Sequence, residues 1–169
     1  MGGTLIRLVE DKHEGHVAYM TSGNIAVFDH DARQVADLVT EFNRLFGIDE
    51  KKSHALEERV AQALANKKSG ESDSPEVLAI KSLIRWAEAK AGAIVAGCRE
   101  EHLHFLDLPF YRTGTIAKKP LTDEDIRLIR ELIERVDPAQ IYVAGDLSDP
   151  HGTHRVCAEA IFRAVLGLE

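Results

Sequence analysis

Apolar residues recur at helical spacing in several long segments of the chain. Within residues 29–46 they include Val35, Leu38 and Phe42, which lie on one face of a helix, and Gly47 supplies a stop. Ser74 and Pro75 give a cap and a favoured first residue to another long segment. This pattern predicts helices over residues 2–11, 29–46, 50–66, 75–98, 121–136 and 153–166.

Short apolar runs bounded by turn residues alternate with these helices. They predict strands at residues 17–21, within HLHFLDLPF at residues 102–110, and in QIYVAG at residues 140–145. Strands that alternate with helices are typical of a parallel sheet covered on both faces. We therefore predict a single domain over residues 1–169, with an α/β, Rossmann-like three-layer αβα fold and a mostly parallel sheet. Such domains usually begin with a central strand, whereas this chain begins with a glycine pair and a helix, so we expect the first strand to be missing.

Composition limits the classes of function. The 169 residues are 44% hydrophobic and 29% charged, which is typical of a soluble globular protein. A formal net charge of -7 argues against nucleic-acid or membrane-surface partners. The sequence has no signal peptide pattern and no apolar run of membrane-spanning length. Cys98 and Cys157 lie in predicted helices without close-spaced pairing, so we expect free thiols and a cytoplasmic location.

The densest group of reactive side chains is AGDLSDPHGTHRVCAEA, residues 144–160. It places two aspartates, a proline and two histidines between the last predicted strand and the last helix. Ligands of parallel sheets bind at the carboxyl ends of the strands, which is where this turn lies. His151 and His154, one helical turn apart, would face the same pocket. Alternatively, Asp149 and Thr153 merely cap the last helix.

Other candidates also have a purely structural alternative. Ser22 and Asn24 end a strand at the same edge, but a Ser-Gly-Asn turn needs no ligand. Arg85 with Glu88 one turn on is either a binding pair or a surface ion pair. His102 and His104 would share one face of a strand and would suit a metal, although partly buried strand histidines are the more common case.

Several blocks together resemble a known family. These blocks are Met1-Gly2-Gly3-Thr4-Leu5, Tyr19-Met20-Thr21-Ser22-Gly23-Asn24, Ile84-Arg85 with Glu88, His104-Phe105-Leu106-Asp107-Leu108-Pro109, and Asp149-Pro150-His151 with His154. With them the chain resembles the LmbE-like or PIG-L-like de-N-acetylases. More narrowly, it resembles the C-terminal half of bacterial chains described as glucosamine-6-phosphate deaminase, in which such a domain follows a deaminase domain.

The resemblance implies a Zn-dependent hydrolase that removes the acetyl group from an N-acetylglucosamine-type amino sugar. By that comparison, His154 is a metal ligand, His151 stabilises the oxyanion or protonates the leaving amine, and Asp149 orients an imidazole. The family's first strand ends in His-Pro-Asp-Asp, which supplies a His and an Asp to the metal and a second Asp as general base. This signature precedes Gly-Gly-Thr in the family and is absent here, so we expect weak or no zinc binding and no activity from the chain alone.

The resemblance also implies which residues contact the substrate and which partners the chain has. Arg85, Asp107, Ser22 and Asn24 are expected to contact the sugar, although the family's acidic residue usually falls nearer Phe110 than Asp107 does. Two alternatives are a catalytically dead fragment and a non-catalytic accessory domain of a fused or separate glucosamine-6-phosphate deaminase. Because a missing strand would leave unpaired edges, we also expect a homo-oligomer whose interface lies beside QIYVAG.

Overall fold

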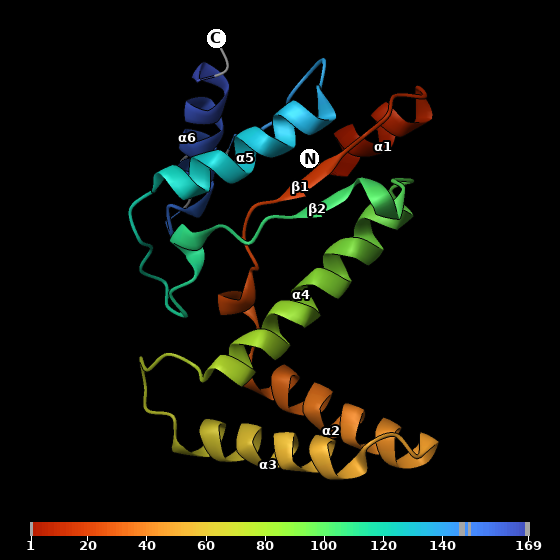
Figure 1. Ribbon diagram of the computed structural model, residues 1–169, viewed down its shortest axis with the longest axis vertical. Helices are drawn as coiled ribbons and strands as arrows, with labels where there is room; N and C mark the ends of the chain where they lie inside the picture. The colour runs from red at the N-terminus through yellow and green to blue at the C-terminus, as the bar shows by residue number, and fades with distance from the viewer. Residues whose placement is uncertain (1, 146–147, 149, 168–169) are drawn as a thin grey trace. The chain divides into compact units, whose positions relative to one another are not determined.

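The computed structural model describes residues 2–145, 148 and 150–167 (Figure 1). The chain folds as two compact units. One, here called the sheet unit, combines the chain before Gly23 with the chain after Glu88, and the other, the hairpin unit, is Gly23–Glu88. The boundary after Glu88 falls within the long helix Pro75–Val95, so the first part of this helix belongs to the hairpin unit and its end to the sheet unit.

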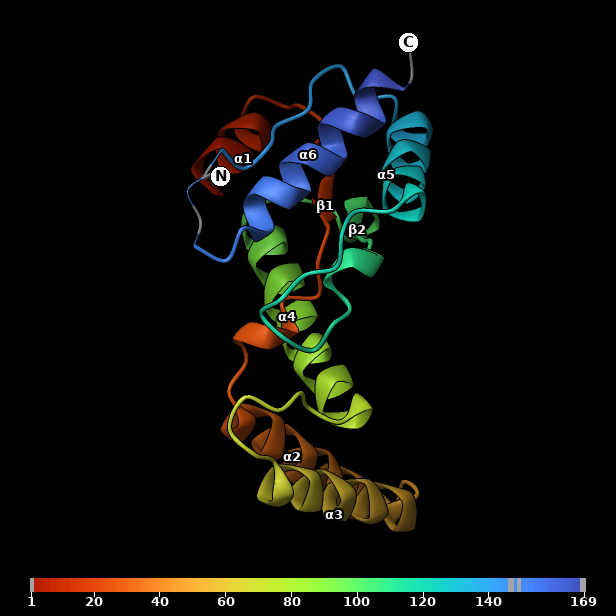
Figure 2. The same cartoon turned by 90° about the vertical axis from the view of Figure 1, so that its left-hand side faces the viewer.

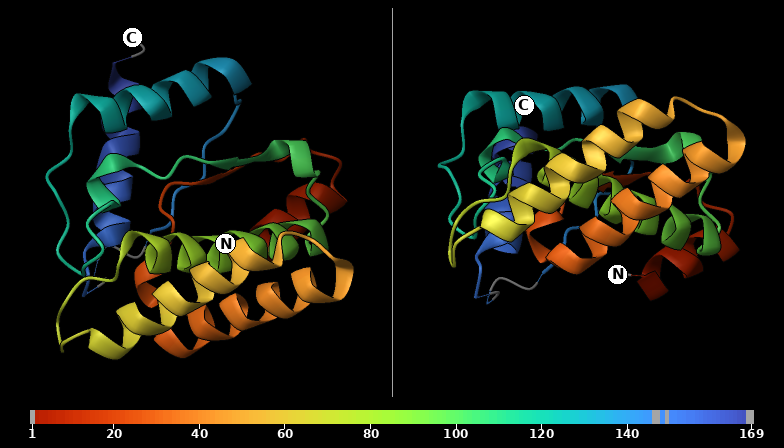
Figure 3. Two further views of the ribbon diagram at one scale, coloured as in Figure 1. Left: turned by 60° about the horizontal axis from the view of Figure 1, so that its bottom comes forward. Right: turned by 90° about the horizontal axis from the view of Figure 1, so that it is seen from below.

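The hairpin unit is helical. Its elements are the 3-10 turn η1 (Asn24–Ala26), α2 (Asp29–Phe46), α3 (Glu50–Asn66) and the first part of α4 (Pro75–Val95). Helices α2 and α3 run side by side (Figure 3). Gly47 ends α2 in a left-handed conformation, with φ of 65°, and its N–H donates to the Asn43 carbonyl. Small residues Ala32 and Ala36 let α2 pack closely on Val60 of α3 and on Val77 of α4.

The sheet unit holds the only strands in the part of the chain that the structure describes. Its elements are α1 (Gly2–Glu10), β1 (Val17–Tyr19), η2 (Glu100–His102), β2 (Leu103–Phe105), η3 (Pro109–Tyr111), α5 (Asp123–Val136) and α6 (Thr153–Leu166), with the end of α4. Strands β1 and β2 pair in parallel, from Val17 opposite Leu103 to Tyr19 opposite Phe105. The rings of Tyr19 and Phe105 stack across the pair with centroids 4.9 Å apart.

The core of the sheet unit lies around α5, α6 and η3. Helices α5 and α6 pack together (Figure 2), and α5 also contacts η3. Leu108 and Phe110 are buried, as are Ile129 of α5 and Ala160 of α6. No helix among the described residues is both long and apolar enough to cross a membrane.

Most predicted elements are confirmed, but the prediction of a strand in residues 140–145 is wrong. All six helices form, with α4 ending at Val95 because the chain turns at Gly97, whose φ is 90°. Residues 141–145 have no regular secondary structure, and Ile141 and Tyr142 are exposed. A strand needs a neighbour to satisfy its backbone groups, and the only ladder in the described residues joins β1 to β2. The fold is therefore α/β with a small parallel sheet, and the three-layer arrangement stays a prediction.

Candidate functional site

The carboxyl end of the sheet holds two of the predicted site residues. Beyond the strands, the Leu106 N–H donates to the Tyr19 carbonyl at 2.9 Å and the Leu108 N–H to the Met20 carbonyl at 2.8 Å. These bonds hold together the two segments that follow the strands, as far as Ser22 in one and Asp107 in the other. Ser22 is buried. Ser22 therefore lies at the end of the sheet that the sequence indicated, and Asp107 lies there too; their contact with a sugar stays a prediction.

Asp107 has a backbone conformation that is rare for a residue with a side chain. Its φ is 43°. The Arg112 Nε donates both to the Asp107 main-chain oxygen, at 2.8 Å, and to its Oδ2, at 3.1 Å. A left-handed residue other than glycine persists only where its surroundings hold it, and such residues are enriched at functional sites. The turn after β2 therefore holds the Asp107 carboxylate against Arg112.

Asn24 and Arg85 come together in the hairpin unit. Gly23 has a φ of 67°, and a side chain there would meet the Arg85 Nε at 3.2 Å. Arg85 donates to Glu88 Oε2 at 2.5 Å, so the expected ion pair is confirmed. Asn24 donates to Ser82 Oγ at 3.1 Å, while its Oδ1 is buried with no hydrogen-bond partner among the described residues. The turn thus lies beside a half-exposed guanidinium, whereas the Asn24 amide oxygen is buried. Contact of either residue with a sugar stays a prediction.

The two histidines of the last motif flank the start of α6. His151 and His154 are both exposed. Gly152 is the N-cap, with φ of 67° and no side-chain cap bond, and Thr153 is the first helical residue, so Thr153 does not cap the helix. Asp149, the predicted orienting group, lies outside the described residues.

A catalytic zinc takes about three protein ligands. In the described part of the chain, the one group of three potential donors is Glu14, His16 and His102, so His151 and His154 belong to no such group there. The two imidazoles supply fewer ligands than a catalytic zinc takes. The donors described at α6 therefore do not complete the family's metal site.

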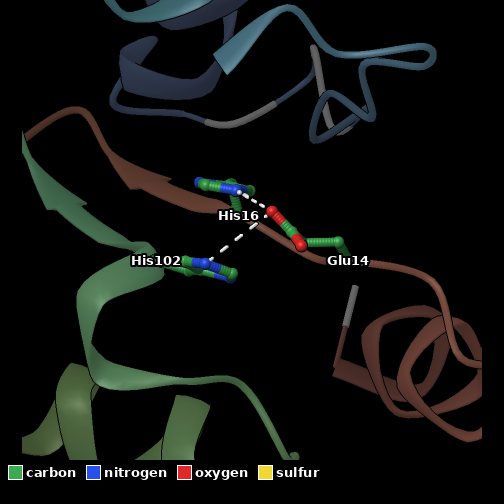
Figure 4. Close-up of side chains that lie close together, drawn as sticks. All are labelled: Glu14, His16 and His102. Carbon is green, nitrogen blue, oxygen red and sulfur yellow. Dashed lines mark hydrogen bonds and ion pairs between the residues drawn. The ribbon is translucent and has the colours of Figure 1, made fainter. Parts of the chain in front are cut away.

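A second cluster of polar side chains lies at the amino end of the sheet. His16 immediately precedes β1 and His102 immediately precedes β2, so the parallel register holds the two side by side. Their rings stack with centroids 4.0 Å apart and an interplanar angle of 15°. Glu14 Oε1 lies 3.3 Å from His16 Nε2 and 3.8 Å from His102 Nε2, and both imidazoles face this one carboxylate (Figure 4).

Neighbouring side chains fix the charges around this cluster. His16 Nδ1 and His104 Nε2 are hydrogen-bonded at 3.0 Å. Burial lowers the pKa of His104, and the nearby His16 and Arg135 lower it further, which favours a neutral imidazole. The hydrogen bond from His16 is the main reason that the pKa of Glu14 is lowered. The carboxylate is therefore a charged acceptor beside imidazoles.

Sequence reasoning found part of this cluster. The spacing of His102 and His104 indicated a shared strand face, whereas Glu14 and His16 were not recognised. The available signal was a Glu-x-His directly before one strand and a His directly before another. Only the pairing register, which the sequence does not state, brings these segments together.

These features define an α/β protein with polar groups at both ends of a short parallel sheet. The chain belongs to the PIG-L family, described as GlcNAc-PI de-N-acetylase, whose pattern matches residues 1–165. Members of this family are metal-dependent deacetylases. The resemblance inferred from the sequence is therefore confirmed.

One relative extends the comparison. The chain is 48% identical over 168 residues to a protein of Bacteroides thetaiotaomicron named "Putative glucosamine-6-phosphate deaminase-like protein". The match covers 98% of this chain and 25% of the relative, so the chain spans a quarter of that protein's length. No solved structure matches the chain significantly.

Proposed function

We propose that this chain is the core of a Zn-dependent de-N-acetylase that hydrolyses the acetamide of an N-acetylglucosamine-type amino sugar. The observation that carries the proposal is the family match over residues 1–165, together with the two histidines at the start of α6. Zinc, when bound in such an enzyme, polarises the acetamide carbonyl and activates a water. His154 would be one ligand in this chain.

The chain's own side chains supply the remaining roles. His151 precedes α6 by two residues and is separated from His154 by the left-handed Gly152, so the predicted spacing of one helical turn is wrong. We propose that His151 stabilises the oxyanion or protonates the leaving amine. Asp149 would accept a hydrogen bond from an imidazole and set its orientation. Ser22, Asn24, Arg85 and Asp107 would bind the sugar, with the guanidinium suited to an anionic or hydroxyl-rich group.

Because the donors at α6 do not complete a zinc site, we propose that the chain alone is inactive. The test measures acetate released from N-acetylglucosamine and its 6-phosphate. It compares the chain alone with the same chain joined, ahead of Gly2, to a strand that ends in His-Pro-Asp-Asp.

Only the longer polypeptide should release acetate, and His151→Ala or His154→Ala should lower its kcat by roughly 10²-fold or more, the contribution typical of a general acid or base. Arg163→Ala, an exposed change further along α6, serves as the matched control. Acetate release by the chain alone that survives His154→Ala would refute the assignment.

A second candidate function rests on the relative's name and length. A chain that matches a quarter of a deaminase-like protein fits an accessory domain of a glucosamine-6-phosphate deaminase, fused or separate. This candidate predicts that adding the chain changes ammonia release by the deaminase part of such a protein. It also predicts that the lengthened polypeptide releases no acetate.

A further inference from the structure

The cluster at the amino end of the sheet has no part in the proposed reaction. Its position is set by backbone pairing: Val17 opposite Leu103 places the residues just before them, His16 and His102, next to each other. His102 is buried, whereas Glu14 reaches in from the loop after α1 with its side chain 66% exposed. Three segments of the sheet unit thus converge on one point.

The spacing of the donor atoms suits a tetrahedral metal ion. With bonds of about 2.0–2.1 Å, neighbouring ligand atoms around tetrahedral zinc are about 3.3–3.5 Å apart. Glu14 Oε1 lies 3.3 Å from His16 Nε2 and 3.8 Å from His102 Nε2, and all three atoms lie within 4.8 Å of one another. The bond between His104 and His16 Nδ1 resembles the outer hydrogen bonds that orient metal-binding imidazoles.

A cation already lies at this point. Arg99 Nη2 is 2.7 Å from His102 Nε2 and 3.3 Å from Glu14 Oε2. Because a guanidinium only donates, His102 Nε2 is the acceptor of this bond and its lone pair points toward Arg99 Nη2. The Arg99 side chain is 58% exposed and also approaches Glu101 at 3.5 Å, so an alternative partner is at hand.

We infer that Glu14, His16 and His102 form a binding site for Zn²⁺ or a similar divalent transition metal, separate from the proposed catalytic turn. Two imidazoles and one carboxylate favour zinc over the hard cations magnesium and calcium. A pocket of about 290 Å³, lined by Val9, His13, Glu14, Gly97, Arg99 and His102, opens onto the site and leaves room for a water as fourth ligand.

Metal binding requires three changes. The proton that His16 Nε2 donates to Glu14 must leave, because the metal takes the lone pair on that nitrogen. Arg99 must leave His102 Nε2, because the metal takes the same lone pair. His102 must also turn out of its stack on His16, because each imidazole lone pair lies in the plane of its ring. His16 keeps its bond to His104 throughout, so it is the fixed ligand and His102 the one that adjusts.

The test is equilibrium dialysis of the whole chain against zinc chloride, with folding checked by circular dichroism. Wild-type protein and His154→Gln should each bind one zinc. Glu14→Gln and His102→Gln should each weaken binding by about tenfold or more. Arg99→Gln should tighten binding, because it removes the competing cation. Since Glu14 is largely exposed, its variant tests the site even if His102→Gln fails to fold.

Two results would overturn the inference. One is zinc binding lost in His154→Gln and retained in Glu14→Gln, which would place the metal at α6 instead. The other is a failure of the wild-type chain to bind zinc at any concentration that leaves it folded.

Discussion

At the scale of single residues, Asp125 connects two elements of the sheet unit through one buried carboxylate. Its Oδ1 accepts the Phe110 N–H at 2.9 Å. Its Oδ2 accepts the Thr122 N–H at 2.9 Å and the Thr122 hydroxyl at 2.7 Å. Asp125 is therefore the N3 residue of the capping box on α5, and it also anchors η3, which follows the candidate Asp107 turn.

Asp125→Ala should lower the free energy of unfolding by about 2–4 kcal/mol, because it removes a helix cap and leaves the buried Phe110 N–H unpaired. Urea titration followed by circular dichroism measures the change. Asp123→Ala, an exposed change in the same turn, should shift stability by less than about 0.5 kcal/mol. Equal effects from both variants would show that the buried bonds to Phe110 and Thr122 are not what stabilises this region.

At the scale of elements, a buried ionic network joins the start of α2 to α4 and the loop before it. Lys81, with its side chain 4% exposed, contacts Asp29 Oδ1 at 2.5 Å and Asp73 Oδ2 at 2.7 Å. Lys67 bridges the same two carboxylates. Burial alone would raise the pKa of Asp29, but hydrogen bonds from Lys81 and Lys67 outweigh it and lower the pKa overall.

Lys81→Met should destabilise the protein by about 3 kcal/mol or more, because it leaves two buried or half-buried carboxylates with one cation. A lowered carboxyl pKa contributes stability that is present above the unfolded value of about 3.9 and is lost as pH falls through the folded value. Stability of the variant should therefore depend less on pH in that acid range. Urea titrations from neutral pH into this range, with exposed Lys68→Met as control, give both quantities; an unchanged pH slope would contradict the prediction.

Whether the sequence predicts an element depends on whether neighbouring residues or long-range contacts determine it. The helix over Asp29–Phe46 and its stop at Gly47 follow from local periodicity and one left-handed glycine, and both are correct. The capping of α5 by Thr122 is equally local. The QIYVAG segment has a strand's composition, yet strand formation needs a partner, and composition does not supply one. The same limit hid the Glu14–His16–His102 cluster, whose members meet only through the register of β1 with β2.

At the scale of the whole molecule, the open strand edges and exposed apolar side chains of the sheet unit are relevant to self-association. The described sheet has two strands, so each has an outer edge, and Ile141 and Tyr142 of the same unit are 43% and 50% exposed. Open edges and exposed apolar side chains favour association. We propose, as the sequence indicated, a homo-oligomer whose interface includes this segment.

Light scattering across a concentration series should give a mass above that of one chain, and Tyr142→Glu should shift it toward the monomer. Leu45→Lys, a substitution at a 77% exposed residue of the hairpin unit, serves as the control and should leave the mass unchanged. A monomer at every concentration would contradict the proposal, and dissociation by Leu45→Lys alone would move the interface to α2.

The split of the sheet unit along the chain has a consequence for how the protein folds. The hairpin unit is a single continuous segment stabilised by neighbouring helices, whereas β1 and β2 pair only after a loop of more than eighty residues closes. Local contacts form quickly, and long-range parallel pairing is slow because the loop-closure entropy precedes any gain from contact. A folded helical hairpin replaces most of that flexible loop with a compact body, so its early formation should reduce the entropy lost when the strands meet. The Gly23–Glu88 insertion would then act as a folding aid for the unit that carries both the candidate catalytic turn and the histidine cluster.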